Sequence, residues 1–91
     1  INIKSKNGSI KVEYLQLEDN TYNTIKTNNG KIKINVAGTV VLNTETYGGK
    51  IYFEGANMGS SNTFVTGRNS TSFSPELILK SGFGVIEVER W

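Results

Sequence analysis

Apolar and polar residues alternate in several short stretches of this chain, and four of these stretches begin two residues after a glycine. Alternation with a period of two is typical of a β-strand that buries one face and exposes the other. No segment has the spacing of an amphipathic helix. The pattern therefore predicts an all-β fold with little or no helix. The apolar positions of the four stretches are Ile10 and Val12, Ile32 and Ile34, Ile51 and Phe53, and Ile86 and Val88.

A longer pattern surrounds each of these stretches, so the chain contains an internal repeat. Each copy has Lys (once Glu) followed by Ser or Thr, a turn that ends in Gly, and then the apolar–polar–apolar stretch. The copies span residues 3–12, 25–34, 44–53 and 79–88. Their aligned glycines, Gly8, Gly30, Gly49 and Gly84, are spaced 22, 19 and 35 residues apart. A period near 20 is typical of stacked repeats, with insertions in loops. We expect these glycines to form structural turns with positive φ.

The repeats could form isolated hairpins or stack on one another. In hairpins Lys4 would face Lys11 and Lys26 would face Lys33, which is unfavourable. The pattern therefore favours stacking, which predicts a short β-solenoid of about four coils with residues 1–91 as a single domain. In chain order the inner columns would be Ile10, Ile32, Ile51, Ile86 and Val12, Ile34, Phe53, Val88. The outer columns would be Lys4, Lys26, Glu45, Lys80 and Lys11, Lys33, Tyr52, Glu87.

The segment Gly55–Ile78 separates the third and fourth repeats. It is rich in turn-forming residues around a short strand predicted at Thr63–Thr66, and Pro75 excludes a central strand at its own position. Another short strand is predicted at Val40–Leu42. We interpret the long segment as a surface excursion between coils, with a binding loop as the alternative.

The amino-acid composition limits the size of the core and excludes several kinds of catalytic and metal-binding chemistry. The chain has 91 residues, of which 36% are hydrophobic, so any core is thin. Asn, Thr, Ser and Gly together contribute 38 residues, which suits strands and turns. Without Cys or His the chain has no disulfide, no Cys/His zinc site and no imidazole catalysis. The sequence predicts no cofactor and no metal site.

Charge and hydropathy limit the partners. The net charge of +2 arises from dispersed lysines, which predicts no nucleic-acid partner. No stretch approaches the ~20 apolar residues of a membrane helix, and no signal peptide is visible, so the chain itself is expected to be soluble. It begins at Ile1 rather than Met, as a domain cut from a longer protein would.

Paired carboxylates are the remaining route to catalysis. Glu87 and Glu89 share one face of a strand, but they alternate with Val88 near the chain end, so a solvated face is the better interpretation. Glu18 and Asp19 fall in an expected turn and lack the spacing of a calcium loop. We therefore predict no catalytic residues and no enzyme. The candidate binding surface comprises Tyr52, Lys33, Glu87, Arg68 and Asn69.

The sequence resembles the bacterial toastrack family, adhesin-like one-sided β-solenoid domains of cell-envelope proteins. The resemblance covers Ile3 to Val88 and is carried by Asn7–Val12, Asn29–Ile34 and Ser81–Val88. It implies a domain that acts by binding and assembly in a stress-response protein of the bacterial cell envelope. It also implies membrane association through segments absent from this chain, and it offers no catalytic residues.

These observations predict a non-enzymatic binding or scaffold domain whose partner is a protein or a cell-surface component. The alternatives are a carbohydrate or surface adhesin module that uses Tyr52 and the loops of Gly55–Ile78, and a self-assembling structural β-solenoid. We expect the end strands to be protected by Lys4 and Lys6 in the first and by Glu87, Glu89 and Arg90 in the last. A monomer or a weak open oligomer is therefore expected.

Overall fold

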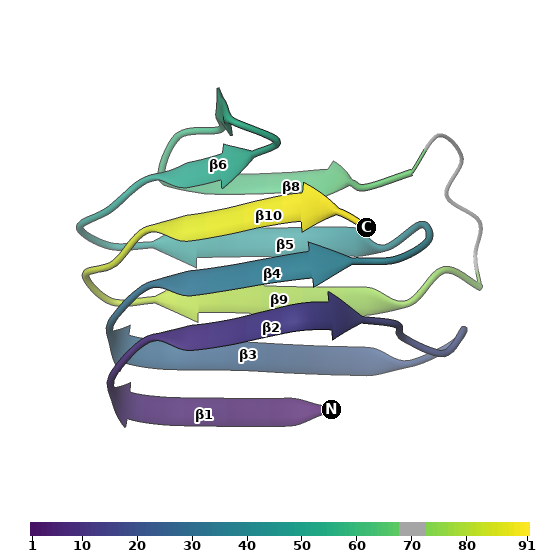
Figure 1. Ribbon diagram of the computed structural model, residues 1–91, viewed down its shortest axis with the longest axis horizontal. Helices are drawn as coiled ribbons and strands as arrows, with labels where there is room; N and C mark the ends of the chain where they lie inside the picture. Colours follow the sequence, from purple (N-terminus) through teal and green to yellow (C-terminus); the bar gives the residue numbers. More distant parts are fainter. Residues whose placement is uncertain (68–72) are drawn as a thin grey trace.

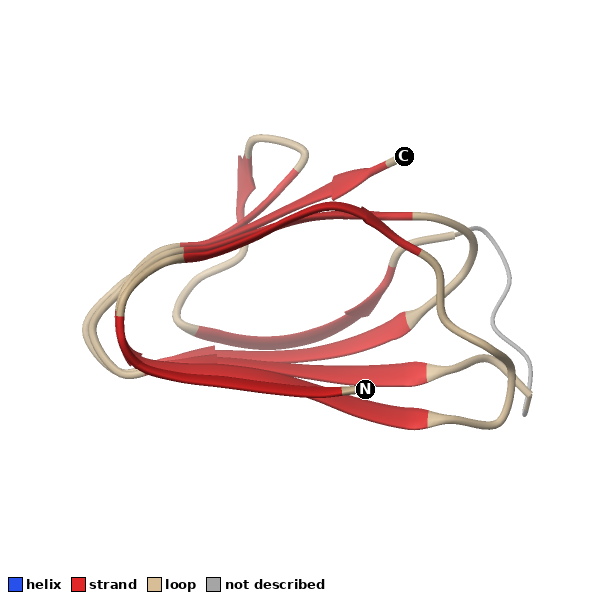
Figure 2. Ribbon diagram, turned by 60° about the horizontal axis from the view of Figure 1, so that its bottom comes forward, coloured by secondary structure: helices blue, strands red, loops and turns tan. Residues whose placement is uncertain are grey.

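The computed structural model describes residues 1–67 and 73–91, which form ten strands in two facing sheets (Figures 1 and 2). Within these residues there is no helix, so the predicted all-β fold is confirmed. The first sheet has the order β1 (Asn2–Asn7), β3 (Tyr22–Asn29), β9 (Glu76–Ser81), β5 (Val41–Thr46) and β8 (Ser61–Val65). The second has the order β2 (Ile10–Leu15), β4 (Ile32–Val36), β10 (Ile86–Arg90), β6 (Ile51–Phe53) and β7 (Ala56–Asn57).

Each repeat places one strand in each sheet, joined by the glycine turn. The resulting units are β1–β2, β3–β4, β5–β6 and β9–β10, and neighbouring units pair in parallel in both sheets. The register pairs Ile10 with Ile32, Ile32 with Ile86, and Ile86 with Ile51. The second apolar column is Val12, Ile34, Val88 and Phe53. The membership of both predicted columns is thus confirmed.

The order of the units differs from the chain order that we expected. The fourth unit, β9–β10, lies between the second and the third (Figure 1). The reason lies in the segment after β6, because its strands β7 and β8 pair antiparallel with the outer edges of β6 and β5. With those edges occupied, β9 and β10 pair with the inner edges instead. The prediction that the last strand forms an edge is therefore wrong, because β10 lies in the centre of its sheet.

Strands β7 and β8, which belong to the segment Gly55–Ile78, close one end of the core. Within this segment, β8 covers the predicted strand at Thr63–Thr66 apart from its last residue, and β9 begins directly after Pro75. The ring of Phe64 on β8 lies 4.9 Å from that of Phe53, and Met58 packs against the same cluster. At the opposite end β1 and β2 are edge strands, and Ile3 remains 36% exposed. The core is therefore capped at one end and open at the other.

A column of hydroxyl side chains explains the Ser or Thr of each repeat. Ser5, Thr27, Ser81 and Thr46 are adjacent in the register of the first sheet. Three of them donate hydrogen bonds to the turn glycine of the preceding unit in the stack. These bonds run from Thr27 to the Gly8 carbonyl (3.0 Å), from Ser81 to that of Gly30 (2.8 Å) and from Thr46 to that of Gly84 (2.7 Å). The hydroxyls thus satisfy carbonyls that the turns leave unpaired.

The turn glycines meet two different requirements. Gly8 and Gly30 have positive φ, as expected, whereas Gly49 and Gly84 do not. At Gly84 the reason for glycine is close approach, because a Cβ there would overlap the carbonyl oxygen of Gly30. The expectation of positive φ at all four positions is therefore wrong. Glycine is also required where one turn stacks tightly on the next and leaves no space for a side chain.

Candidate binding site

The outer face of the second sheet brings three predicted surface residues together. Glu87 on β10 is paired with Lys33 on β4 on one side and with Tyr52 on β6 on the other. The expectation that Tyr52 also lies beside Lys33 is wrong, because the insertion of β10 places Glu87 between them. The remaining two predicted residues, Arg68 and Asn69, lie outside the residues that the structure describes.

A shallow hollow of about 240 Å³ lies on this face, lined by Tyr52, Gly55, Glu87 and Glu89. The two glutamates share the face because they are two positions apart on β10. Gly55 closes the hollow at the turn between β6 and β7, where Glu54 and Gly55 both have positive φ, 51° and 82°. The hollow therefore combines two carboxylates and a phenol ring on paired strands.

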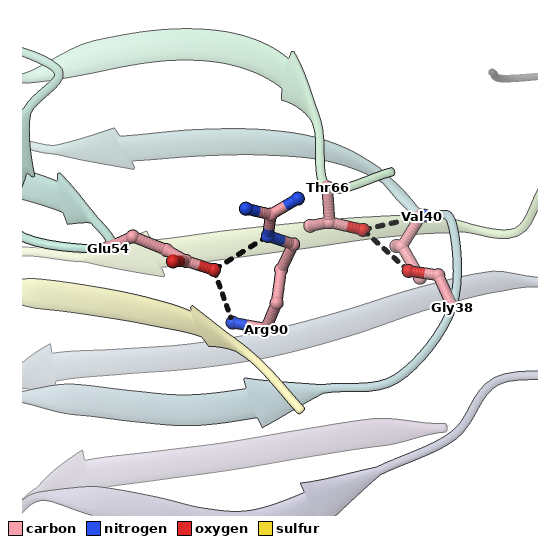
Figure 3. Close-up of polar contacts among 5 residues, drawn as sticks. All are labelled: Gly38, Val40, Glu54, Thr66 and Arg90. Carbon is pink, nitrogen blue, oxygen red and sulfur yellow. Dashed lines mark hydrogen bonds and ion pairs between the residues drawn. The ribbon is translucent and has the colours of Figure 1, made fainter. Parts of the chain in front are cut away.

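Two basic residues border this acidic surface. The Nζ atom of Lys31 lies 3.1 Å from Oε1 of Glu87, so that carboxylate is already paired on one side. Arg90 donates from Nε and from its backbone N–H to Oε1 of Glu54, at 2.7 and 3.2 Å (Figure 3). These bonds to Arg90 lower the pKa of the Glu54 carboxyl from its ordinary value of 4.5. The end of β10 is thereby attached to the turn that borders the hollow.

The capping strands are anchored in a similar way. Thr66, directly after β8, donates to the carbonyl of Gly38 and accepts from the backbone N–H of Val40, both at 2.9 Å (Figure 3). Thr66 is buried, so these bonds satisfy its hydroxyl out of contact with water. This contact fixes the start of β5 to the end of β8.

Sequence reasoning missed the Glu54–Arg90 pair. Glu54 falls just after the third repeat and Arg90 just after the fourth, so the repeat pattern assigned neither a partner. Only the proximity of units three and four brings them together. Glu18 and Asp19 precede Asn20, which has a φ of 60°, in keeping with the predicted turn. The described residues contain no cluster of three or more acidic, His or Cys side chains suited to a metal.

Fold and site together define an all-β domain with a shallow hollow on the outer face of its second sheet. Neither a protein-family model nor a curated protein matches the sequence. The fold is similar to the crystal structure of a putative cell adhesion protein from Clostridium sporogenes, with a TM-score of 0.54 and 16% sequence identity. The match covers 99% of this chain and 55% of that one. At this identity the likeness extends to the fold alone. None of the described residues belongs to a helix long and apolar enough to span a membrane.

Proposed function

We propose that this chain is a non-enzymatic binding domain that takes a cationic side chain of a protein partner into the hollow formed by Tyr52, Glu87 and Glu89. The observation that carries the proposal is the presence of two carboxylates and an aromatic ring around one hollow. A guanidinium group is attracted both by carboxylates and by the face of an aromatic ring. An arginine of the partner is the best match, because its planar fork can contact a carboxylate while it stacks on a ring.

Binding without turnover fits the surroundings of the two glutamates. A glycosidase needs one carboxyl group shielded in an apolar surrounding so that it can act as a general acid. Here Glu89 is exposed and Glu87 is paired with Lys31. The hollow offers recognition of charge and shape, and the proposal requires no cofactor and no nucleic acid.

The proposal extends to architecture and location. The four units act as coils of a short one-sided β-solenoid of the toastrack type, within a bacterial cell-envelope protein attached to the membrane through segments outside this chain. The in-register repeats and the name of the structural neighbour support this view. That name also favours a second candidate function, cell adhesion, for which we propose a cell-surface carbohydrate as the ligand. Self-assembly into a polymer is less favoured, because β7 and β8 cap one end.

The experiment is an NMR titration of the isotope-labelled chain with a tri-arginine peptide. We expect shifts of the amides around Tyr52, Glu87 and Glu89, and their loss in the double variant Glu87→Gln/Glu89→Gln. The matched control, Glu13→Gln/Glu45→Gln, makes the same charge change on other strands and should bind as the wild type does. Equal loss in the control, or shifts confined to another face, would contradict the proposed site.

A further inference from the structure

Three lysines occupy consecutive positions across the outer face of the first sheet. Lys4 on β1 is paired with Lys26 on β3, and Lys26 is paired with Lys80 on β9. Neighbouring strands lie about 4.8 Å apart, so the three ammonium groups project from points separated by one strand each. We call Lys4, Lys26 and Lys80 the lysine column.

The lysine column exists because of the order of the units. In chain order Glu45 would separate Lys26 from Lys80, but the structure places Glu45 on the far side of Lys80. The same order of units mixes the charges on the second sheet, because it places Glu87 between Lys33 and Tyr52. Like charges on directly opposite positions are unfavourable, so the first sheet retains a repulsion that a bound anion would relieve.

The surface around the column is concave and its positive charge is largely uncompensated. One hollow of about 250 Å³ is lined by Lys4, Ser5, Lys6, Lys26 and Asn28. A second, of about 180 Å³, includes Lys26, Asn28, Lys80, Glu45 and Tyr47, so the two share Lys26 and Asn28 and form one groove.

Within the described residues, the ion pair recorded in the groove joins Lys80 to Glu45, with Nζ and Oε2 3.9 Å apart and both side chains half exposed. Such a pair contributes little. The four lysines and one glutamate give the groove a charge of +3, whereas the whole chain has +2.

From this geometry we propose that the groove binds an acidic polysaccharide. A single small anion would neutralise one or two lysines, whereas a polymer with a charge on successive units can follow the column across three strands. Asn28 supplies an amide that can donate to and accept from sugar hydroxyls. Tyr47 at the far end is 86% exposed, and its edge-on contact with Phe83 leaves ring surface open for a sugar to stack on. This site lies on the opposite face from the hollow at Tyr52, and so goes beyond the proposed function.

The test is isothermal titration calorimetry with polygalacturonate oligomers, using neutral dextran and polyglutamate as comparison polymers. The column variant is Lys4→Gln/Lys26→Gln/Lys80→Gln. The matched control is Lys11→Gln/Lys33→Gln/Lys50→Gln, and both triples change the net charge from +2 to −1. We expect polygalacturonate to bind the wild type. Its affinity for the column variant should be lower by about tenfold or more, and its affinity for the control should be within about twofold of that for the wild type. Binding should weaken between low and high salt, and dextran should not bind.

Loss of affinity in the control equal to that in the column variant would overturn the assignment of the site. Absence of polygalacturonate binding would overturn the proposal itself. Equally tight binding of polyglutamate, of duplex DNA or of phosphatidylglycerol vesicles would overturn the assignment of the ligand class. Circular dichroism checks that the column variant is folded, which is expected because its substitutions remove repulsion. The tri-arginine titration of the column variant should match that of the wild type. The proposals for the hollow at Tyr52 and for the groove are therefore tested independently.

Discussion

The hydroxyl of Ser81 donates a hydrogen bond of 2.8 Å to the carbonyl oxygen of Gly30, across 51 positions of the chain. The same carbonyl faces Gly84, where a Cβ would overlap it. The Gly30 carbonyl thus contacts two residues of the fourth unit. It accepts a hydrogen bond from Ser81, and it leaves no space for a side chain at Gly84. The stacking of the turns depends on this combination.

Alanine substitutions at Gly8 and Gly30 should separate the cost of stacking from the cost of backbone conformation. Both residues have nearly equal φ, 152° and 151°. A Cβ on Gly30 would overlap the carbonyl of Gly8, whereas the nearest atom to a Cβ on Gly8 is the Ser5 hydroxyl at 3.6 Å. Gly30→Ala should therefore lower the free energy of unfolding by about 1–3 kcal/mol more than Gly8→Ala, measured by urea denaturation. Equal losses would contradict the importance of turn stacking.

Removal of the Ser81 hydroxyl should be costly because the side chain is buried. We expect Ser81→Ala to lower the free energy of unfolding by about 1–2 kcal/mol, since the Gly30 carbonyl loses the donor that the buried Ser81 hydroxyl supplies. Ser5→Ala is the control, because Ser5 occupies the same column at the open, half-buried end. Thermal denaturation of both variants measures the difference. A loss at Ser5 as large as that at Ser81 would argue against the hydroxyl column.

The Glu54–Arg90 contact predicts a pH-dependent effect of defined sign. Because Arg90 lowers the pKa of Glu54, the pair stabilises the fold above the ordinary value of 4.5, and this contribution is lost as the pH falls through the lowered value. In Arg90→Gln the pKa of Glu54 should rise towards 4.5, as measured by NMR titration of the carboxyl carbon. Lys11→Gln, far along the stack, should leave it unchanged. A Glu54 pKa that is the same with and without Arg90 would refute the contact.

The proposed absence of catalysis is tested with a glycan panel. Purified protein should release no reducing sugar, because Glu87 and Glu89 lack the shielded surrounding of a general acid. The double variant Glu87→Gln/Glu89→Gln serves as the blank. Turnover by the wild type that disappears in this variant would establish an enzyme and reverse the proposal.

The open edge predicts association when its charges are removed. β1 is an edge strand that carries Lys4 and Lys6, and charged residues at such positions oppose pairing with other chains. Lys4→Val/Lys6→Val should give a rise of apparent mass with concentration in light scattering. Lys31→Val/Lys33→Val is the control and should scatter as the wild type does, because Lys33 lies in β4, which is paired on both sides, and Lys31 directly precedes that strand. Association of both variants to the same extent would show a general effect of lost charge.

The repeat pattern alone was sufficient to predict strands, turns and columns. Alternation of apolar and polar residues determines which side of a strand is buried, so the pattern places Ile10, Ile32, Ile51 and Ile86 in one column without specifying their order. The Ser or Thr before each turn was visible as a pattern, but its purpose was not. A hydroxyl three positions before a glycine gives no sign that it bonds to the glycine of another unit.

The order of the units was decided only in three dimensions. Each unit presents nearly the same strand edges. Local sequence therefore cannot specify whether the fourth unit pairs beyond the third or between the second and the third. Pairing of β7 and β8 with the outer edges of β6 and β5 decides it, and these pairings arise from a segment outside the repeat. At each of the two candidate sites, one neighbour relation across strands follows from that choice. Both the position of Glu87 between Lys33 and Tyr52 and the uninterrupted lysine column are determined by the tertiary structure, because strand neighbours are set by edge availability and not by position in the chain.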